Sequence, residues 1–417
     1  MWWFISISNW LLVGLFVGFI FSTVSLGVLY SVNVGGFGYI VGDCILLDSC
    51  GFILGLLTLM IWLVLWVMGV SNFFISLSVF SALLSYVSVN SLVFWFFYEL
   101  SIISALLLLV KDSPYPERYC ASWYFGGYII LSGVPLLLCI LIVSFFEGTV
   151  SFLGWNISNY NMVFWLMCLM FMTKVPVPPF HVWLPLVHAE ASSPVSIILS
   201  GYIMKLGVLG VIRFGGGVFN SDLLLGVVVW LCIFGLLFVL SSYIECDAKR
   251  WLAMLSLFHI LVAVLLLSFG TGDYDLVSLL YCFGHGVAAA SAFLAIWWGY
   301  SYIGSRDWYM LSCVLGGVLG VQLLIGLMFL CVAGFPPTLQ FISELLVVVS
   351  LSGVSDYVML FVVSFFLFGG SLLVFVIFGM VLVSSGVFGS ICYLGLDKCL
   401  MGVLFMSVFG VLSGFLL

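Results

Sequence analysis

Charged residues are scarce in this chain. It has 9 lysines and arginines and 16 aspartates and glutamates among 417 residues, whereas 65% of its residues are hydrophobic. A soluble domain of this length could not cover its surface with so few polar groups. The shortage of charge therefore excludes a soluble globular protein and predicts a protein that lies in a membrane.

Signals for cleavage and for bound cofactors are also missing. No lysine or arginine precedes Lys111, so we expect the apolar segments themselves, and not a basic cleavable signal, to direct insertion. The 12 cysteines are scattered singly, without a CxxC pair, which argues against zinc, iron–sulfur clusters or a disulfide framework. No GxGxxG, GxxxxGKS or GxxxxGKT motif is present. We therefore expect no cofactor, no metal and no nucleic-acid partner, with any redox chemistry in partner proteins.

Long apolar runs are what the chain does have, and they are continuous, which favours helices over a barrel. A crossing needs about 20 residues, and the runs predict an all-α polytopic membrane protein with about 13 transmembrane helices, or 14 if residues 1–41 hold a further short span. The expected spans are Trp10–Tyr30, Gly51–Met68, Phe73–Ser88, Leu92–Val110, Ser122–Phe146, Asn161–Phe180, Val195–Phe214, Leu223–Tyr243, Trp251–Ser268, Leu276–Tyr300, Leu311–Ser350, Tyr357–Val383 and Leu400–Leu417.

The few charges are sorted between the loops that join these spans. Even-numbered loops carry the basic residues Lys111, Arg118, Lys249, Arg250, Arg306 and Lys398. Odd-numbered loops carry the acidic residues Asp43, Asp48, Glu147, Asp222, Asp273, Asp275 and Asp356. Arg213, at the end of a span, is the exception. The pattern places the amino terminus on the basic side of the membrane.

Two segments interrupt the pattern of spans. Leu311–Ser350 would run about 60 Å as one straight helix, twice the thickness of the bilayer core, and the run GFPP at 334–337 must break it. Four prolines between 176 and 185 interrupt the other segment. We therefore expect discontinuous helices around 174–194 and 334–344, of the kind that line polar cavities in transporters.

A carboxylate and a lysine lie inside the apolar segments. Glu99 is near the middle of a span, where a lone carboxylate is driven to its neutral form unless a cation lies beside it. Lys174 is the natural partner, and such a pair responds to nearby charge by shifting protons. The alternative is a static ion pair that only fixes helix packing.

A second lysine, Lys205, lies beside Gly201, Gly207 and Gly210, which can admit close packing or water. Its ammonium could instead reach the membrane interface, because Arg213 is only two turns away. A single buried histidine is more often a satisfied core residue. However, two histidines that follow two lysines in order favour a proton relay, and these are His259 and His285.

Further polar groups lie near the two helix interruptions. Glu344 follows the GFPP run, and His181, His188 and Glu190 surround the sequence WLP. The latter three could bind a metal by residue type, but we expect Pro185 to deny them a regular helix face. They are better interpreted as polar groups at the mouth of a proton path.

The order of the motifs resembles that of a known family. The run from Lys174 to Arg213 reads K-x-P, H-x-W-L-P, H-x-E-A and K-L-G-x-x-G-x-x-R, and it is accompanied by FYEL at Glu99, PER at 116–118, DAK at 247–249, GHG at 284–286 and PPTLQFISE ending at Glu344. Over about residues 43–417 the chain resembles the antiporter-like subunits of mitochondrial NADH:ubiquinone oxidoreductase (complex I). The H-x-E-A and K-L-G combination is that of the subunit 4 family and not of subunits 2 and 5. The chain departs from the family at Leu186 and Ser192, where Lys and Pro are usual.

The resemblance implies one transmembrane domain over residues 1–417, with N-terminal helices in 1–90, a proton-channel core in 91–352 and C-terminal helices in 353–417. It implies that Glu99 and Lys174 are the charged pair, Lys205 the central relay lysine, His259 and His285 relay histidines, and Glu344 the glutamate at the exit of the channel.

The implied function is proton translocation across the mitochondrial inner membrane, driven by electron transfer from NADH to ubiquinone. Flavin, iron–sulfur clusters and ubiquinone would be held by partner subunits. The implied neighbours are antiporter-like subunits 2 and 5, accessory subunits and membrane lipids. A stand-alone cation/proton antiporter subunit with the same core is the alternative. A non-pumping structural membrane protein would leave the buried charges unexplained.

Overall fold

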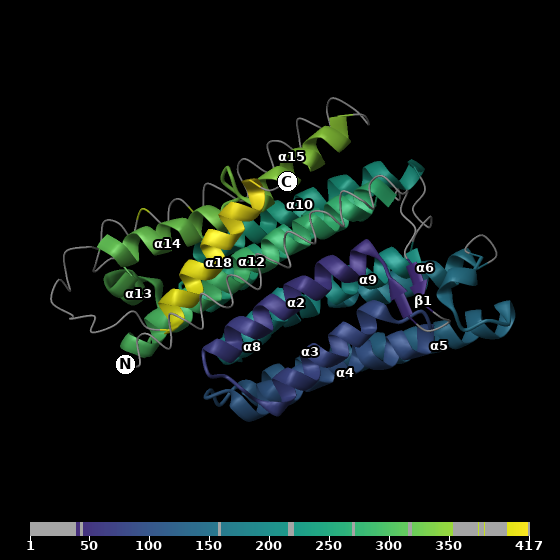
Figure 1. Cartoon of the computed structure of the whole chain (residues 1–417), viewed down its shortest axis with the longest axis horizontal. Helices are drawn as coiled ribbons and strands as arrows, with labels where there is room; N and C mark the ends of the chain where they lie inside the picture. Colours follow the sequence, from purple (N-terminus) through teal and green to yellow (C-terminus); the bar gives the residue numbers. More distant parts are fainter. Residues whose placement is uncertain are drawn as a thin grey trace.

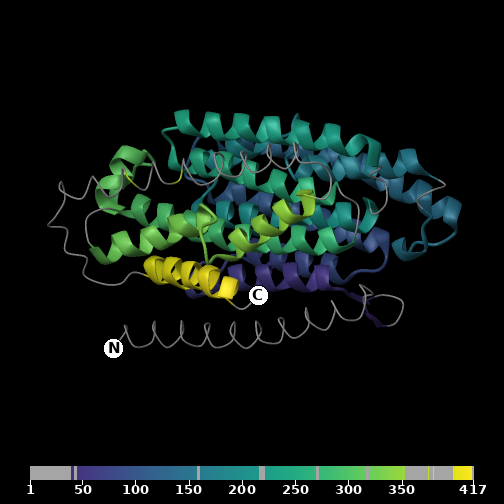
Figure 2. The ribbon, with the colours of Figure 1, turned by 90° about the horizontal axis from the view of Figure 1, so that it is seen from above.

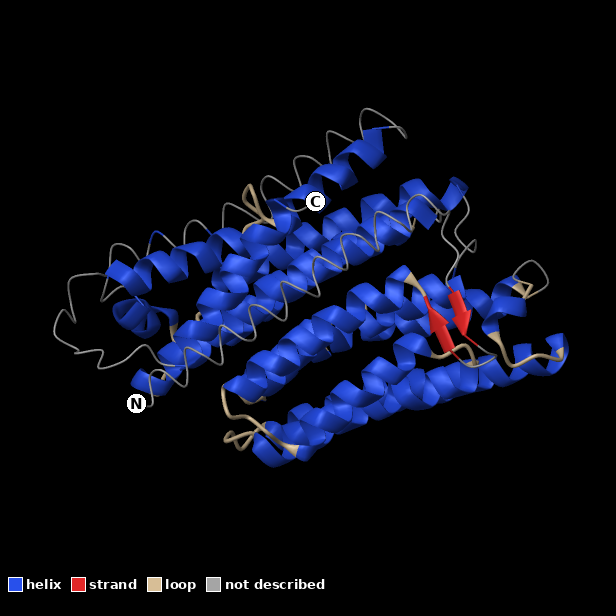
Figure 3. Ribbon diagram, viewed as in Figure 1, coloured by secondary structure: helices blue, strands red, loops and turns tan. Residues whose placement is uncertain are grey.

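Long helices that lie nearly side by side make up the described part of the chain (Figure 1). The structure, a computed structural model, describes residues 39–41, 45–156, 160–215, 221–268, 272–315, 319–352, 374, 379 and 398–415. The view from above shows the same elongated arrangement (Figure 2), and a two-stranded hairpin is the one sheet in these ranges (Figure 3).

The elements follow one another in a simple order. The longer helices are α2 (Ser49–Val67), α3 (Phe73–Val87), α4 (Ser91–Asp112), α5 (Arg118–Glu147), α6 (Asn161–Lys174), α9 (Met204–Gly215), α10 (Ser221–Ile244), α11 (Ala248–Leu267), α12 (Gly272–Ile303), α14 (Leu319–Val332), α15 (Leu339–Ser352) and α18 (Lys398–Phe415). The short elements are η1 (Phe152–Gly154), α7 (Trp183–Glu190), α8 (Ser193–Ile198), the π-helical turn η3 (Leu199–Ile203) and α13 (Trp308–Leu315). Strand β1 (Tyr39–Val41) pairs antiparallel with β2 (Ile45–Leu47).

Each expected span that falls within the described ranges contains at least one helix, so the all-α polytopic fold is confirmed. The spans Asn161–Phe180 and Leu311–Ser350 also contain the helix breaks. Six helical stretches in the described ranges are long and apolar enough to cross a membrane, with Ser193–Gly215 (α8, η3 and α9) counted as one. The expected span Trp10–Tyr30 lies outside the described residues, and Tyr357–Val383 does so except at two positions. The count of about 13 crossings therefore stays a prediction.

Polar side chains fix where several helices begin. Asp48 accepts a hydrogen bond from the Gly51 amide at the start of α2, and Asn90 accepts from the Leu92 amide at the start of α4. Asp247 does the same for α11. Each side chain satisfies an amide that has no partner inside its helix, so these scarce polar residues set the ends of apolar helices.

The loops gather at two ends of the bundle in the way the charge pattern predicts. At the even-loop end, Arg306 forms an ion pair with Asp247, at 3.3 Å, and Lys249 donates to the Ala191 carbonyl. We call this the basic end. At the opposite, acidic end, Arg213 pairs with Asp48 at 3.2 Å. The one cation that departs from the charge pattern thus has an acidic partner beside it.

Both expected helix interruptions are present. Helix α6 ends at Lys174 and α7 begins at Trp183, while α14 ends at Val332 and α15 begins at Leu339. The expectation that Pro185 prevents a regular helix was wrong, because Pro185 lies in the first turn of α7. An amide there has no acceptor within the helix, so a proline costs little.

The helices differ in how much of their surface the bundle covers. The apolar window of α12 is 94% buried, whereas that of α5 is only 39% buried. In Figure 1, α2, α8 and α9 lie between the α3–α5 group and the group that contains α10, α12 and α18. The centre of the described bundle therefore holds α9 and α12, and α5 presents an apolar outer face to lipid or to a neighbouring protein.

Candidate functional site

A buried ion pair joins two helices in the α4–α6 region. Glu99 is in the middle of α4 and Lys174 is the last residue of α6, and Lys174 Nζ lies 3.8 Å from Glu99 Oε2. Both side chains are nearly inaccessible, at 6% and 4% exposure. None of their charged atoms has a hydrogen-bond partner within the described residues. The ammonium and the carboxylate therefore depend mainly on each other for compensation of their buried charges.

A glycine makes room for the carboxylate of this pair. A methyl group at Gly133 of α5 would lie 2.7 Å from Glu99 Oε1, closer than real contacts allow. The Gly133 carbonyl accepts a hydrogen bond of 3.0 Å from the Trp95 indole. Helices α4 and α5 therefore approach closely where Glu99 lies, and any larger residue at position 133 would displace it.

Lys205 lies at the junction of η3 and α9 and is completely buried. In η3 the Met204 amide donates to the Leu199 carbonyl, five residues back, and not to the Ser200 carbonyl, four residues back. The Ser200 carbonyl accepts a hydrogen bond from the Lys205 ammonium. The π-helical turn thus supplies a polar backbone group to the lysine, as π-bulges often do at functional sites. The side chain does not extend to the interface.

Close helix packing explains the glycines around Lys205. Gly201, Gly207 and Gly210 face Ile61, Val175 and Phe171, respectively. Lys205 also interacts electrostatically with three buried histidines, which are His188, His259 and His285. The packing of small residues therefore brings the centre of α9 close to α6, and α9 also contacts α11 and α12, which carry two of these histidines.

The two predicted relay histidines lie together. The ring centroids of His259 in α11 and His285 in α12 are 5.2 Å apart. His259 Nδ1 is 2.9 Å from the Tyr281 hydroxyl and 2.9 Å from Gln340 Nε2. His259 Nδ1 therefore lies within hydrogen-bond distance of two polar side chains, one from α12 and one from α15.

Gln340 connects the histidines to the last predicted site residue. Its Nε2 has two hydrogens, and the second is donated to Glu344 Oε1, at 3.3 Å and one turn further along α15. Glu344 is partly exposed, in contrast to the five other site residues. Its carboxylate lies against Gly334, where a methyl group would be 2.9 Å from either oxygen and where φ is +63°. The helix interruption at 334 thereby creates the space for Glu344.

Sequence reasoning missed Gln340 and Tyr281, although both are buried polar residues in apolar helices. Gln340 stands four residues before Glu344, so the two share one helix face. This spacing was the available signal. Tyr281 is four residues before His285 in α12, and a tyrosine in such a helix is not distinctive by itself.

The residues around WLP anchor α7 in the bundle. Trp183 stacks on Phe125 of α5, with centroids 5.0 Å apart, and donates to the Thr173 carbonyl at the end of α6. His188 is fully buried and stacks on Phe293 of α12, at 5.1 Å. Neither His188 nitrogen has a hydrogen-bond partner within the described residues. His188 thus lies inside the bundle, whereas the sequence predicted it at the mouth of a proton path.

Cations surround the carboxyl end of α7. Lys249 donates to the Ala191 carbonyl at 2.7 Å and Arg306 donates to the Ala189 carbonyl, where helix dipoles favour positive charge. The Arg306 guanidinium lies 4.2 Å over the Tyr115 ring. Burial, with the hydrogen bond to Tyr300, raises the pKa of the Tyr115 phenol above its usual range, so this residue stays neutral.

This fold and these contacts define a class of protein: a polytopic helical membrane protein with antiporter-like architecture, in which broken helices hold buried ionisable groups. The family described as "NADH:quinone oxidoreductase/Mrp antiporter, TM" matches residues 88–370. The chain belongs to this family.

Individual relatives agree with the assignment to the family. The chain is 30% identical over 267 residues to NADH-ubiquinone oxidoreductase chain 4 of Ascaris suum, in an alignment that spans 63% of either chain. A chain of respiratory complex I from Thermus thermophilus has the same fold, with a TM-score of 0.75, 20% identity and coverage of 98% and 96% of the two chains. A chain of the Mrp complex from Dietzia sp. also shares it, with a TM-score of 0.74, 16% identity and coverage of 91% and 44%.

Proposed function

We propose that this chain is the antiporter-like subunit 4 of mitochondrial NADH:ubiquinone oxidoreductase, and that it carries protons across the inner membrane. The observation that carries the proposal is the series of buried polar groups that runs from the Glu99–Lys174 pair past Lys205 to the histidines and Glu344. The name of the Ascaris suum relative supports the assignment to subunit 4.

In the proposed mechanism, the Glu99–Lys174 ion pair is where proton transfer begins. Burial penalises the charged form of Lys174, and the Glu99 carboxylate favours it. When a change of charge nearby weakens that attraction, Lys174 releases its proton through bound water to Lys205. Lys205 holds the proton against the Ser200 carbonyl and passes it on. The pair therefore couples electrostatics to proton movement.

In the last part of the proposed path, the two histidines and Gln340 connect Lys205 to Glu344. His259 and His285 are close enough to exchange a proton through a single water, and Gln340 is within hydrogen-bond distance of His259 Nδ1. Glu344 receives the proton at the partly exposed end of the series. Electron transfer belongs to partner subunits with flavin, iron–sulfur clusters and ubiquinone, and antiporter-like subunits 2 and 5 are the proposed neighbours.

Alanine variants of the ion pair test the proposal. We expect Glu99→Ala and Lys174→Ala to leave the complex assembled and oxidising NADH, with fewer protons moved per NADH. The measurement is acidification of inner-membrane vesicles alongside NADH oxidation. Lys398→Ala is the matched control, because Lys398 is an exposed lysine at the start of α18. Native stoichiometry in both site variants would contradict the relay.

A stand-alone cation/proton antiporter subunit is the second candidate, and the likeness to the Mrp complex chain favours it. Purification from mild detergent separates the two. Subunit 4 copurifies with flavin and iron–sulfur absorbance, whereas an antiporter subunit copurifies without either.

A further inference from the structure

We propose that Arg213 and its partners seal the acidic end of α9 against protons, so that a proton on Lys205 leaves sideways through His259 and His285. This inference rests on the proposed proton-carrying function. Arg213 follows Lys205 by eight residues in the same helix, which is about 12 Å along the axis. Its side chain is 3% exposed. A straight path from Lys205 to the acidic end of the bundle would pass this residue.

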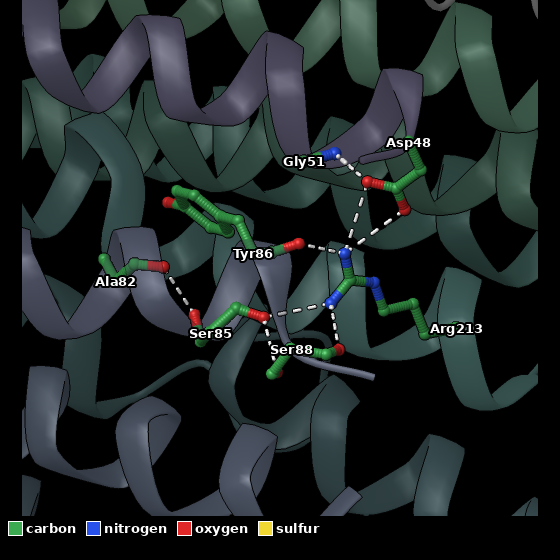
Figure 4. A network of polar contacts seen from close by, with 7 residues as sticks. All are labelled: Asp48, Gly51, Ala82, Ser85, Tyr86, Ser88 and Arg213. Carbon is green, nitrogen blue, oxygen red and sulfur yellow. Dashed lines mark hydrogen bonds and ion pairs between the residues drawn. The ribbon is translucent and has the colours of Figure 1, made fainter. Parts of the chain in front are cut away.

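The guanidinium is held by five acceptor contacts (Figure 4). Nη1 donates to the carbonyls of Ser85 and Ser88, at 2.9 and 3.5 Å. Nη2 donates to the Tyr86 carbonyl and to both Asp48 oxygens, which are 3.3 and 3.2 Å away. The three carbonyls belong to the carboxyl end of α3, and Asp48 begins α2. One side chain thereby closes the junction of three helices.

The chemistry of this group opposes proton passage. A guanidinium in a protein does not lose its proton and has only donors, so it cannot accept a proton from a chain of water molecules. Its positive charge also repels a hydronium ion, in the way that an arginine excludes cations from a pore. The Ser85, Tyr86 and Ser88 carbonyls at this point all accept hydrogen bonds from Arg213.

An aromatic cluster packed around the guanidinium adds a second barrier at this end of α9. Phe171 and Phe214 stack with centroids 5.5 Å apart, and Phe94 lies 5.3 Å from Phe214. The guanidinium lies over Phe94 and Phe152, at 5.8 and 5.6 Å. Buried aromatic surface offers water no hydrogen-bond acceptor of comparable strength, and a constriction of this kind sheds water.

Polar groups continue in the lateral direction instead. Helix α9, which carries Lys205, contacts α11 and α12, which carry His259 and His285, and Gln340 then connects His259 to Glu344. A sealed axial end and a polar lateral route together give Lys205 one direction in which to release its proton. Without the seal, a proton on Lys205 could also pass to the acidic end of the bundle, and protons would leak across the membrane.

Passive proton conductance of the intact complex is the test, measured as the decay of a pH gradient across inner-membrane vesicles without NADH. Arg213→Gln replaces the donor-only cation by a neutral group that donates and accepts, and we expect it to raise the leak per assembled complex several-fold. Arg213→Lys keeps a donor-only cation and is expected to stay at the native level. Asp48→Asn removes the carboxylate but keeps Arg213, and we expect its passive proton conductance to stay at the native level as well.

The double variant Arg213→Gln with Asp48→Asn leaves no unpaired buried charge, so it tests the seal even if Arg213→Gln alone fails to assemble. A native leak in that double variant overturns the proposal. So does a leak in Arg213→Lys and Asp48→Asn as large as in Arg213→Gln, because the cluster would then be only a structural brace. Lys205→Ala in the same vesicles tests the proposed function separately: native pumping in it contradicts the relay, whatever the leak in the Arg213 variants.

Discussion

Several of the ionisable side chains inside the bundle lie against a glycine or against backbone that departs from α-helical geometry. Glu99 lies on Gly133, Lys205 on the π-helical turn η3 and Glu344 on Gly334. A charged group in an apolar bundle needs polar backbone, water or space around it, because desolvation without compensation costs several kcal/mol. The local irregularities supply these, so they belong to the site as much as the titratable residues do.

At this scale, Gln340→Leu isolates the link between His259 and Glu344. The change removes two neutral or charge-assisted hydrogen bonds with little change in volume. Each such bond contributes about 0.5–3 kcal/mol. The loss of one of them from the transition state corresponds to a rate about two- to a hundredfold lower, so we expect proton-coupled NADH oxidation to slow at least about twofold. Stopped-flow acidification of vesicles measures the rate. Tyr281→Phe is the control, because it removes the other partner of His259 Nδ1 but keeps the Gln340 bridge. A native rate in Gln340→Leu would remove Gln340 from the relay.

The helix interruptions act at the scale of elements. The prolines and the GFPP run predicted where α6 and α14 end. The π turn η3 was not predictable from the same pattern, because its sequence LSGYI contains no breaker other than one glycine, and its geometry depends on contacts with α2 and α12. Likewise, α7 begins at Trp183, which stacks on Phe125 of α5, a residue far from it in the sequence. Local sequence locates a break, whereas packing decides its geometry.

Gly207→Ala tests the packing of α9 on α6. A methyl group there would lie 2.6 Å from Val175 Cγ2 and 3.0 Å from the Phe171 carbonyl oxygen. Since a backbone atom cannot rotate away, we expect a loss of about 1–3 kcal/mol of stability, visible as a lower melting temperature of the purified complex. Gly127→Ala is the matched control. It has open space within 4 Å, and the better helix propensity of alanine is expected to make it neutral or stabilising by up to about 1 kcal/mol. Equal melting temperatures would show that the α6–α9 contact is not tight.

For the whole molecule, the two ends differ in charge and in the loops that meet there. Six buried or partly buried residues make up the predicted relay between these ends, and the sequence singled them out because ionisable groups are so rare in its apolar segments. Their role in proton transfer stays a prediction. The sequence could not place them relative to one another. The distance between Glu99 and Lys174 and the bridge through Gln340 depend on which helices are neighbours, and that follows from packing across residues far apart in sequence.

The sidedness of the bundle can be measured with its own cysteines. Cys120 and Cys246 are the exposed cysteines in the described residues, and both are in loops or helix starts at the basic end. We expect a membrane-impermeant maleimide to label both from the basic side and neither from the other side, with Cys120→Ser and Cys246→Ser identifying the bands. The positive-inside pattern predicts that the basic side is the one from which the chain inserts into the membrane. Labelling of one cysteine from each side would contradict the arrangement of the helices.

The π turn η3 has a consequence for rotational phase. An α-helix advances by 100° per residue, and one extra residue accommodated in a wider turn offsets everything after it by about that angle. Ser193–Ile198 and Met204–Gly215 are therefore two helical segments on one axis that are out of phase with each other. Because Lys205 and Arg213 both follow η3 in the same helix, the offset rotates them by the same angle, toward the helices that they contact in this structure. A single-residue deletion within 199–203 would restore a regular helix and turn both cations to different partners at once.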